Sequence, residues 1–178
     1  MLVFAHVISN QAHSALSAPT LTPGFNNSIG FGASVNVGNQ NSSGFGLSII
    51  DYSRRIQGAW SITVGLGFDK KWTEKNDGTE RTSSYSISST LAYDLISLPI
   101  LGLPASMSVF GGASQDFASY NAKTDSHDDD LGTSIGGGVS FAWPVANRWS
   151  VSLSPLMAYE LDSSELSLEI EFSGAYSF

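Results

Sequence analysis

Apolar and polar residues alternate without interruption over the last fourteen positions of the chain. One face carries Leu166, Leu168, Ile170, Phe172, Gly174, Tyr176 and Phe178, and the other carries Glu165, Ser167, Glu169, Glu171, Ser173, Ala175 and Ser177. A period of two is that of a β-strand, whose successive side chains point to opposite faces. The pattern predicts a terminal strand that is apolar on one face and polar on the other.

The same alternation recurs along most of the sequence and predicts eight strands. The apolar rows lie in residues 29–37, 45–49, 60–68, 85–95, 107–117, 131–143, 149–161 and 166–178. The second row is interrupted where Ile49 is followed by Ile50, which predicts a β-bulge. An even number of strands places both chain ends on the same side of an up-and-down barrel.

The polar rows indicate which face is enclosed. In the fourth and sixth predicted strands they read Ser84, Ser86, Ser88, Thr90, Ala92, Asp94 and Gly132, Ser134, Gly136, Gly138, Ser140, Ala142. A water-facing surface is normally rich in charged residues, whereas these rows suit the narrow interior of an eight-stranded barrel. The sequence therefore predicts an all-β, transmembrane, up-and-down antiparallel β-barrel whose apolar rows face lipid.

The connections between the predicted strands fall into two classes. Those at residues 53–58, 96–104 and 144–148 are short, whereas two of the others, residues 70–82 and 118–130, are long and polar. Short periplasmic turns and longer outer loops are usual in membrane barrels. A sheet edge cannot stay open in hydrocarbon, so the first strand, residues 28–37, is expected to pair antiparallel with the last.

Aromatic residues are predicted to form two girdles at the level of the lipid headgroups, where rings with a polar edge are favoured. Both sets lie near predicted strand ends. The periplasmic set is Trp60, Tyr93, Trp143, Trp149, Tyr176 and Phe178, and the outer set is Phe68, Trp72, Tyr85, Phe117 and Tyr159.

The end of the chain resembles the closing strand of bacterial outer-membrane barrels, with a final Phe178 after Phe172 and Tyr176. Over residues 28–178 the chain resembles the small barrels of the OmpA/OmpX type, although Gly174 stands where a larger apolar residue is usual. The resemblance implies a multi-pass protein of the Gram-negative cell outer membrane, in contact with the lipid bilayer and lipopolysaccharide. It also implies insertion by the outer-membrane assembly machinery, with Phe172, Tyr176 and Phe178 as the signal.

Composition agrees with this interpretation. Charged residues make up 13% of the 178 positions, about half of the ~25% found in soluble domains. The net charge of −8 argues against nucleic-acid binding, which needs a basic surface. Cysteine is absent, which excludes disulfides and thiolate metal sites. No cofactor is indicated. Residues 1–27 are expected to be an N-terminal extension, a secretory-signal remnant or a partial plug of the lumen.

Four charged residues are predicted to face the lumen by strand parity: Glu169, Glu171, Arg54 and Asp94. Buried carboxylates need partners or become neutral. Arg54 is the only basic residue that parity points inward, and Lys71 and Arg81 are expected to reach down from the second loop.

The sequence leaves several functions open. We expect a monomer without enzymatic activity, with a structural or interaction role in which its polar outer loops meet a protein partner. The alternatives are a narrow pore for small solutes or ions, a lipid hydrolase at the membrane rim that uses His127, and a soluble ligand-binding barrel. The acidic run at residues 125–130 offers hard oxygen ligands but lacks a metal-site spacing, so no metal site is predicted.

Overall fold

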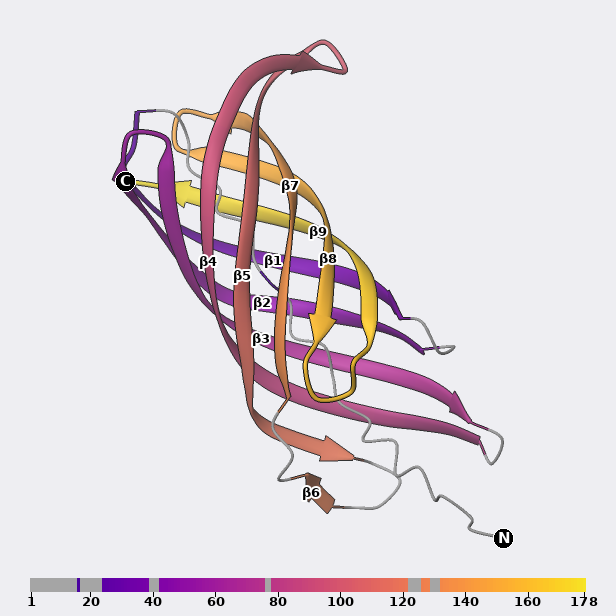
Figure 1. The fold of residues 1–178 in the computed structure, drawn as a ribbon. Helices are drawn as coiled ribbons and strands as arrows, with labels where there is room; N and C mark the ends of the chain where they lie inside the picture. The colour runs from indigo at the N-terminus through magenta and orange to yellow at the C-terminus, as the bar shows by residue number, and fades with distance from the viewer. Residues whose placement is uncertain (1–15, 17–23, 39–41, 76–77, 122–125, 129–131) are drawn as a thin grey trace, which may run out of the picture.

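The computed structural model describes residues 16, 24–38, 42–75, 78–121, 126–128 and 132–178, which form a closed barrel of eight long strands (Figure 1). The strands are β1 (Asn27–Gly38), β2 (Ser42–Gln57), β3 (Trp60–Lys75), β4 (Gly78–Ile100), β5 (Leu103–Asn121), β7 (Thr133–Ala146), β8 (Trp149–Glu160) and β9 (Leu166–Ser177). A short ninth strand, β6 (Ser126–Asp128), pairs with the outer end of β5. Among these residues no helix is long and apolar enough to span a membrane.

Every long strand pairs antiparallel with its neighbours, and the barrel closes where β9 returns to β1. That pairing runs from Ser28 opposite Ser177 to Gly38 opposite Ser167. The predicted eight-stranded, up-and-down topology and the predicted closure are both confirmed.

The two faces of the wall are sorted as the alternation predicts. In β9 the side chains of Leu168 and Phe172 are 60% and 59% exposed on the outside, whereas Glu169 and Glu171 are 2% and 1% exposed on the inside. Apolar side chains outside and polar side chains inside are the reverse of a soluble ligand-binding barrel. This arrangement suits a barrel surrounded by lipid.

The predicted bulge in β2 is present and changes the phase of that strand. The pairing of β2 with β3 shifts between Ser48 and Ile50, so that Ile49 and Ile50 are both exposed on the outside. A bulge adds one residue, and every later side chain moves to the opposite face. Arg54 was predicted to face the lumen, and this prediction is wrong: Arg54 is exposed on the outer face, opposite Ile62.

The strands are longer than the apolar rows that predict them. The periplasmic connections shrink to two-residue turns at residues 58–59, 101–102 and 147–148. The predicted outer loop 70–82 is largely strand, because β3 and β4 stay paired up to Lys75 opposite Gly78. Backbone pairing does not require an apolar row, so it continues beyond the lipid-facing segment at both ends.

The aromatic residues of the two predicted girdles lie on the outer surface in two rows at opposite ends of the strands. At the periplasmic end the ring centroids of Trp60 and Tyr93 are 4.9 Å apart, and those of Trp149 and Tyr176 are 5.2 Å apart. At the outer end Phe68 lies 5.2 Å from Tyr85. The other outward aromatics are Trp143 and Phe178 at the periplasmic end and Trp72, Phe117 and Tyr159 at the outer end. Their contact with lipid headgroups stays a prediction.

Candidate functional site in the barrel interior

Serine and threonine hydroxyl groups line much of the interior and bond to one another across neighbouring strands. The oxygens of Ser53 and Thr63 are 2.7 Å apart, and Ser154 donates to Ser140 at 2.9 Å. Two further pairs, Ser114 with Ser134 and Ser152 with Ser173, are 2.7 and 2.5 Å apart. Hydroxyls both donate and accept, so facing pairs satisfy each other without charge.

Carboxylates far outnumber basic groups inside the barrel. Seven acidic side chains are buried among the described residues, namely Asp51, Asp69, Asp116, Glu160, Glu165, Glu169 and Glu171, against one buried basic side chain, Lys71. Acidic side chains therefore outnumber basic ones in the described interior, and each buried carboxyl group needs a hydrogen-bond or ion-pair partner or takes up a proton.

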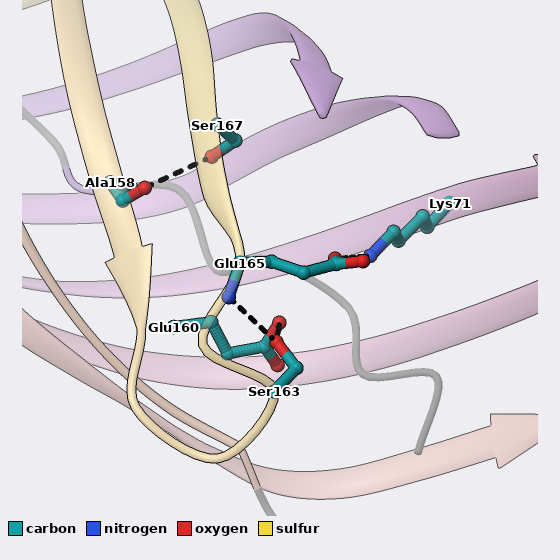
Figure 2. Close-up of polar contacts among 6 residues, drawn as sticks. All are labelled: Lys71, Ala158, Glu160, Ser163, Glu165 and Ser167. Atoms are coloured by element: carbon teal, nitrogen blue, oxygen red, sulfur yellow. Dashed lines mark hydrogen bonds and ion pairs between the residues drawn. The ribbon is translucent and has the colours of Figure 1, made fainter. Parts of the chain in front are cut away.

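Lys71 forms an ion pair across the outer end of the lumen. Its Nζ lies 2.8 Å from Oε2 of Glu165, and the two side chains are only 5% and 11% exposed. Lys71 is on β3 and Glu165 immediately precedes β9, with β2 and β1 between them in the wall. The two side chains reach toward each other across the interior (Figure 2). Lys71 therefore belongs to a strand and points inward, instead of reaching down from a loop.

The turn between β8 and β9 holds Glu165 in place for this contact. The hydroxyl of Ser163 donates to Oε2 of Glu160 at 2.7 Å and accepts from the backbone N–H of Glu165 at 3.3 Å (Figure 2). The backbone N–H of Glu160 donates to the carbonyl of Glu165 at 2.9 Å. These bonds fix the turn from which the Glu165 side chain extends toward β3.

Asp94, predicted to face the lumen, lies at the periplasmic rim and pairs there with Arg55. Nη2 of Arg55 is 2.9 Å from Oδ2 of Asp94, with side chains 25% and 40% exposed. Both residues border a cavity of about 470 Å³ together with residues 24–26. This pair is open to solvent, unlike the pair at the outer end.

One part of the interior is apolar. Ala92, Phe110, Leu156 and Ala158 form a buried cluster on β4, β5 and β8. Leu16, the only described residue before Gly24, is fully buried, and its Cδ1 lies 2.7 Å from the point where a Cβ on Gly136 would stand. Leu16 thus occupies space inside the wall that a glycine leaves open. The plug hypothesis for residues 1–27 stays a prediction.

Sequence reasoning missed most of the interior charge. Asp51 was hidden by the phase change after the bulge, and Asp69 and Lys71 lie in outer strand ends that lack a clear apolar row. Glu165 was placed on the polar face, but its partner on β3 lies 94 positions away. Strand order and register, which bring these residues together, are tertiary information.

The histidine and the acidic run of the outer loop lie mostly outside the described residues. His127 lies on β6 opposite Tyr120, and its side chain is not among those described. Residues 125, 129 and 130 of the acidic run are also outside. In the described part of the chain no group of three or more His, Asp or Glu side chains could hold a metal ion. The hydrolase alternative therefore stays untested.

Comparison with known proteins identifies the fold. No family model matches the sequence, and neither does any curated protein. The crystal structure of Neisserial surface protein A (NspA) is similar with a TM-score of 0.63 and 17% identity, covering 85% of this chain and 97% of that one. A major outer membrane protein from Thermus thermophilus gives a TM-score of 0.56 and 15% identity, covering 85% and 99%. The chain has the fold of the small outer-membrane β-barrels. At these low identities the structural likeness shows the fold and does not select a subfamily.

Proposed function

We propose that this chain is an integral, non-enzymatic barrel of the cell outer membrane that presents its outer strand ends to a protein partner. The observation that carries the proposal is the ion pair between Lys71 and Glu165, which spans the lumen near its outer mouth with both side chains buried. A lumen crossed by its own side chains favours a structural or interaction role over passage of solutes. Fully buried interior carboxylates, such as Glu169 and Glu171, support the same interpretation.

The outer end of the barrel supports a role in recognition. At its outer end β7 pairs with β5 only as far as Thr133, which is opposite Gln115. The wall formed by β3, β4, β5 and β6 continues beyond this level. Residues 70–82 and 121–130 hold half of the charged residues of the chain. A raised, charged sheet edge offers hydrogen bonds and charge complementarity, which set the specificity of protein contacts more than their affinity.

Photo-crosslinking in intact cells tests the interaction role. A photoreactive residue at Thr79, exposed on the β3–β4 hairpin, should yield an adduct of defined mass. The same residue at Ile170, on the outward face of β9, serves as the control and should yield no protein adduct. The adduct should disappear when the charged residues of 74–81 are replaced by serine while the barrel still migrates as a folded, heat-modifiable band. The photoreactive residue is also placed at Tyr120, at the outer end of β5. If neither Thr79 nor Tyr120 yields an adduct, the interaction role is refuted.

A narrow cation pore is the second candidate, because seven buried carboxylates face one buried lysine in the described interior. Those carboxyl groups that are ionised would draw cations into an open lumen and exclude anions. Single-channel recording in planar bilayers separates the two candidates. The closed barrel predicts no resolved steps for the unmodified chain, whereas ohmic steps with a cation-selective reversal potential would replace our proposal with the pore.

A further inference from the structure

The hairpin at the periplasmic end of β4 and β5 leaves the barrel wall (Figure 1). β3 begins at Trp60, which is opposite Tyr93, and the backbone N–H of Asp94 still donates to the carbonyl of Ala59 at 3.0 Å. Beyond this point no described strand pairs with the outer edge of β4. We call residues 95–105 the periplasmic arm.

The other edge of the periplasmic arm is also unpaired. β5 pairs with β7 only from Ser106, opposite Ala142, although β7 continues to Ala146. The two strands therefore diverge where they would otherwise stay in register. A bulge between Asp94 and Ile96 marks the base of the arm, and bulges bend the strand that contains them. In Figure 1 the arm curves away from the neighbouring strands.

The periplasmic arm is apolar, and most of its residues are exposed, Ala105 at its base being buried. Residues 95–105 contain no charged residue and only one polar side chain, Ser97. Ile96 and Leu103 are 57% and 59% exposed, and Leu101 at the tip is 93% exposed. A two-stranded hairpin is only marginally stable alone in water, and exposed apolar patches usually mark a contact surface.

The tip of the periplasmic arm holds a leucine in an unfavourable backbone conformation. Leu101 has a φ of 54° and Gly102 a φ of 78°, the geometry of a two-residue turn that favours Asn-Gly. The other two periplasmic turns use Gly58-Ala59 and Asn147-Arg148. A leucine in the left-handed region is disfavoured, so local structure does not explain the choice of residue. Burial of its side chain in an apolar medium would explain it.

The edges of the periplasmic arm are protected against the addition of another strand. Pro99 lies opposite Pro104, and proline has no backbone N–H to offer. Prolines on edge strands are a known means of preventing edge-to-edge pairing. The arm therefore suits contact through its apolar side chains better than backbone pairing with a partner strand.

The outer face of the arm continues the apolar surface of the barrel. Tyr93 lies opposite Val109 on the outer face, and Ile96 lies opposite Met107 in the next outward position after the bulge. We propose that the periplasmic arm is a membrane anchor that inserts Ile96, Leu101 and Leu103 into the periplasmic leaflet, with phospholipid as its ligand. Surface segments bind at the boundary of headgroups and acyl chains by burying their apolar side chains there. The inference rests on the membrane-spanning barrel proposed above.

Site-directed spin labelling tests the anchor. The chain has no cysteine, so single variants Leu101→Cys and Leu103→Cys can be labelled in the full-length protein in phosphatidylethanolamine and phosphatidylglycerol vesicles. Collisions of the nitroxide with oxygen report exposure to lipid, and collisions with a soluble nickel chelate report exposure to water. Asn147→Cys, at the neighbouring polar turn, is the matched water control, and Ile170→Cys is the lipid control for the barrel itself.

The expected result is a collision rate at 101 and 103 that is several-fold higher with oxygen than with nickel, and the reverse at 147. Nickel-dominated collisions at 101 and 103 would overturn the anchor, and so would labels shielded from both reagents or broadened by a second copy. A label at 170 that is not in lipid would instead refute the membrane barrel. Leu101→Asn, which suits the turn, should raise nickel access at 103 several-fold while the barrel stays folded.

Discussion

Replacing Lys71 by methionine removes one partner of the buried ion pair and leaves its other partner, Glu165, charged inside the barrel. Methionine keeps the length of the side chain and adds no charge. The N···O distance of 2.8 Å and the low exposure of both side chains mean that little water can replace the lost ammonium group. We expect Lys71→Met to be one of the most destabilising single substitutions on the inner wall.

The size of the effect follows from the geometry. Coulomb's law at 2.8 Å with an effective dielectric constant of 20 gives an attraction of about 6 kcal/mol, before the cost of desolvating both ions is subtracted. Removing one partner of a buried pair typically costs about 3–5 kcal/mol, because an uncompensated charge stays buried. Removing both charges costs much less. Lys71→Met and Glu165→Gln should therefore each lower the free energy of unfolding by about 3–5 kcal/mol, and the double variant by under about 2 kcal/mol.

Urea-induced unfolding of the protein in phospholipid vesicles measures these differences, with heat-modifiable gel migration as the criterion of folding. The coupling energy comes from the double-mutant cycle. Raising sodium chloride from 0.1 to 1 M should change the coupling little, since buried pairs are weakly screened. The reasoning fails if Lys71→Met costs less than about 1 kcal/mol, or if the two single effects simply add in the double variant.

Two further substitutions test the packing and the rim. Gly136→Ala would put its Cβ 2.5 Å from a backbone oxygen of β8 and 2.7 Å from Cδ1 of Leu16, so it should cost about 1–3 kcal/mol by overpacking. Gly111→Ala, whose nearest neighbouring atom would be 3.5 Å away, is the matched control and should not destabilise; equal losses in urea titration would contradict the packing of Leu16. Arg55→Ala breaks the solvent-exposed ion pair with Asp94 and should lower the free energy of unfolding by no more than about 1 kcal/mol. A loss as large as that of Lys71→Met would show that the periplasmic rim is less hydrated than its exposure indicates.

The alternation of residue types made the eight strands, their inner and outer faces and the closure of β9 on β1 predictable from sequence. These features depend on a period of two and on the cost of unpaired backbone groups in hydrocarbon, both of which act locally or on every residue alike. The inward position of Glu169 and Glu171 follows from the same pattern, because no bulge interrupts β9.

The residues of β2 after its bulge show what a local pattern cannot predict, namely which face each of these side chains takes. Ile49-Ile50 predicted a bulge, yet only the pairing with β3 shows that the bulge turns Arg54 outward and leaves Arg55 to meet Asp94. Strand length is a second example. Backbone hydrogen bonding continues beyond the apolar rows, so Lys71 and the periplasmic arm belong to strands and not to the predicted loops.

The sequence by itself determined the kind of wall, and the tertiary structure decided what the wall brings together. Alternation states which face a side chain takes, since the pleat fixes it within one strand. It does not state which residue lies across the lumen, because that depends on the order and register of strands far apart in the chain. The contact of Lys71 with Glu165 and the departure of the periplasmic arm from β7 are both consequences of register.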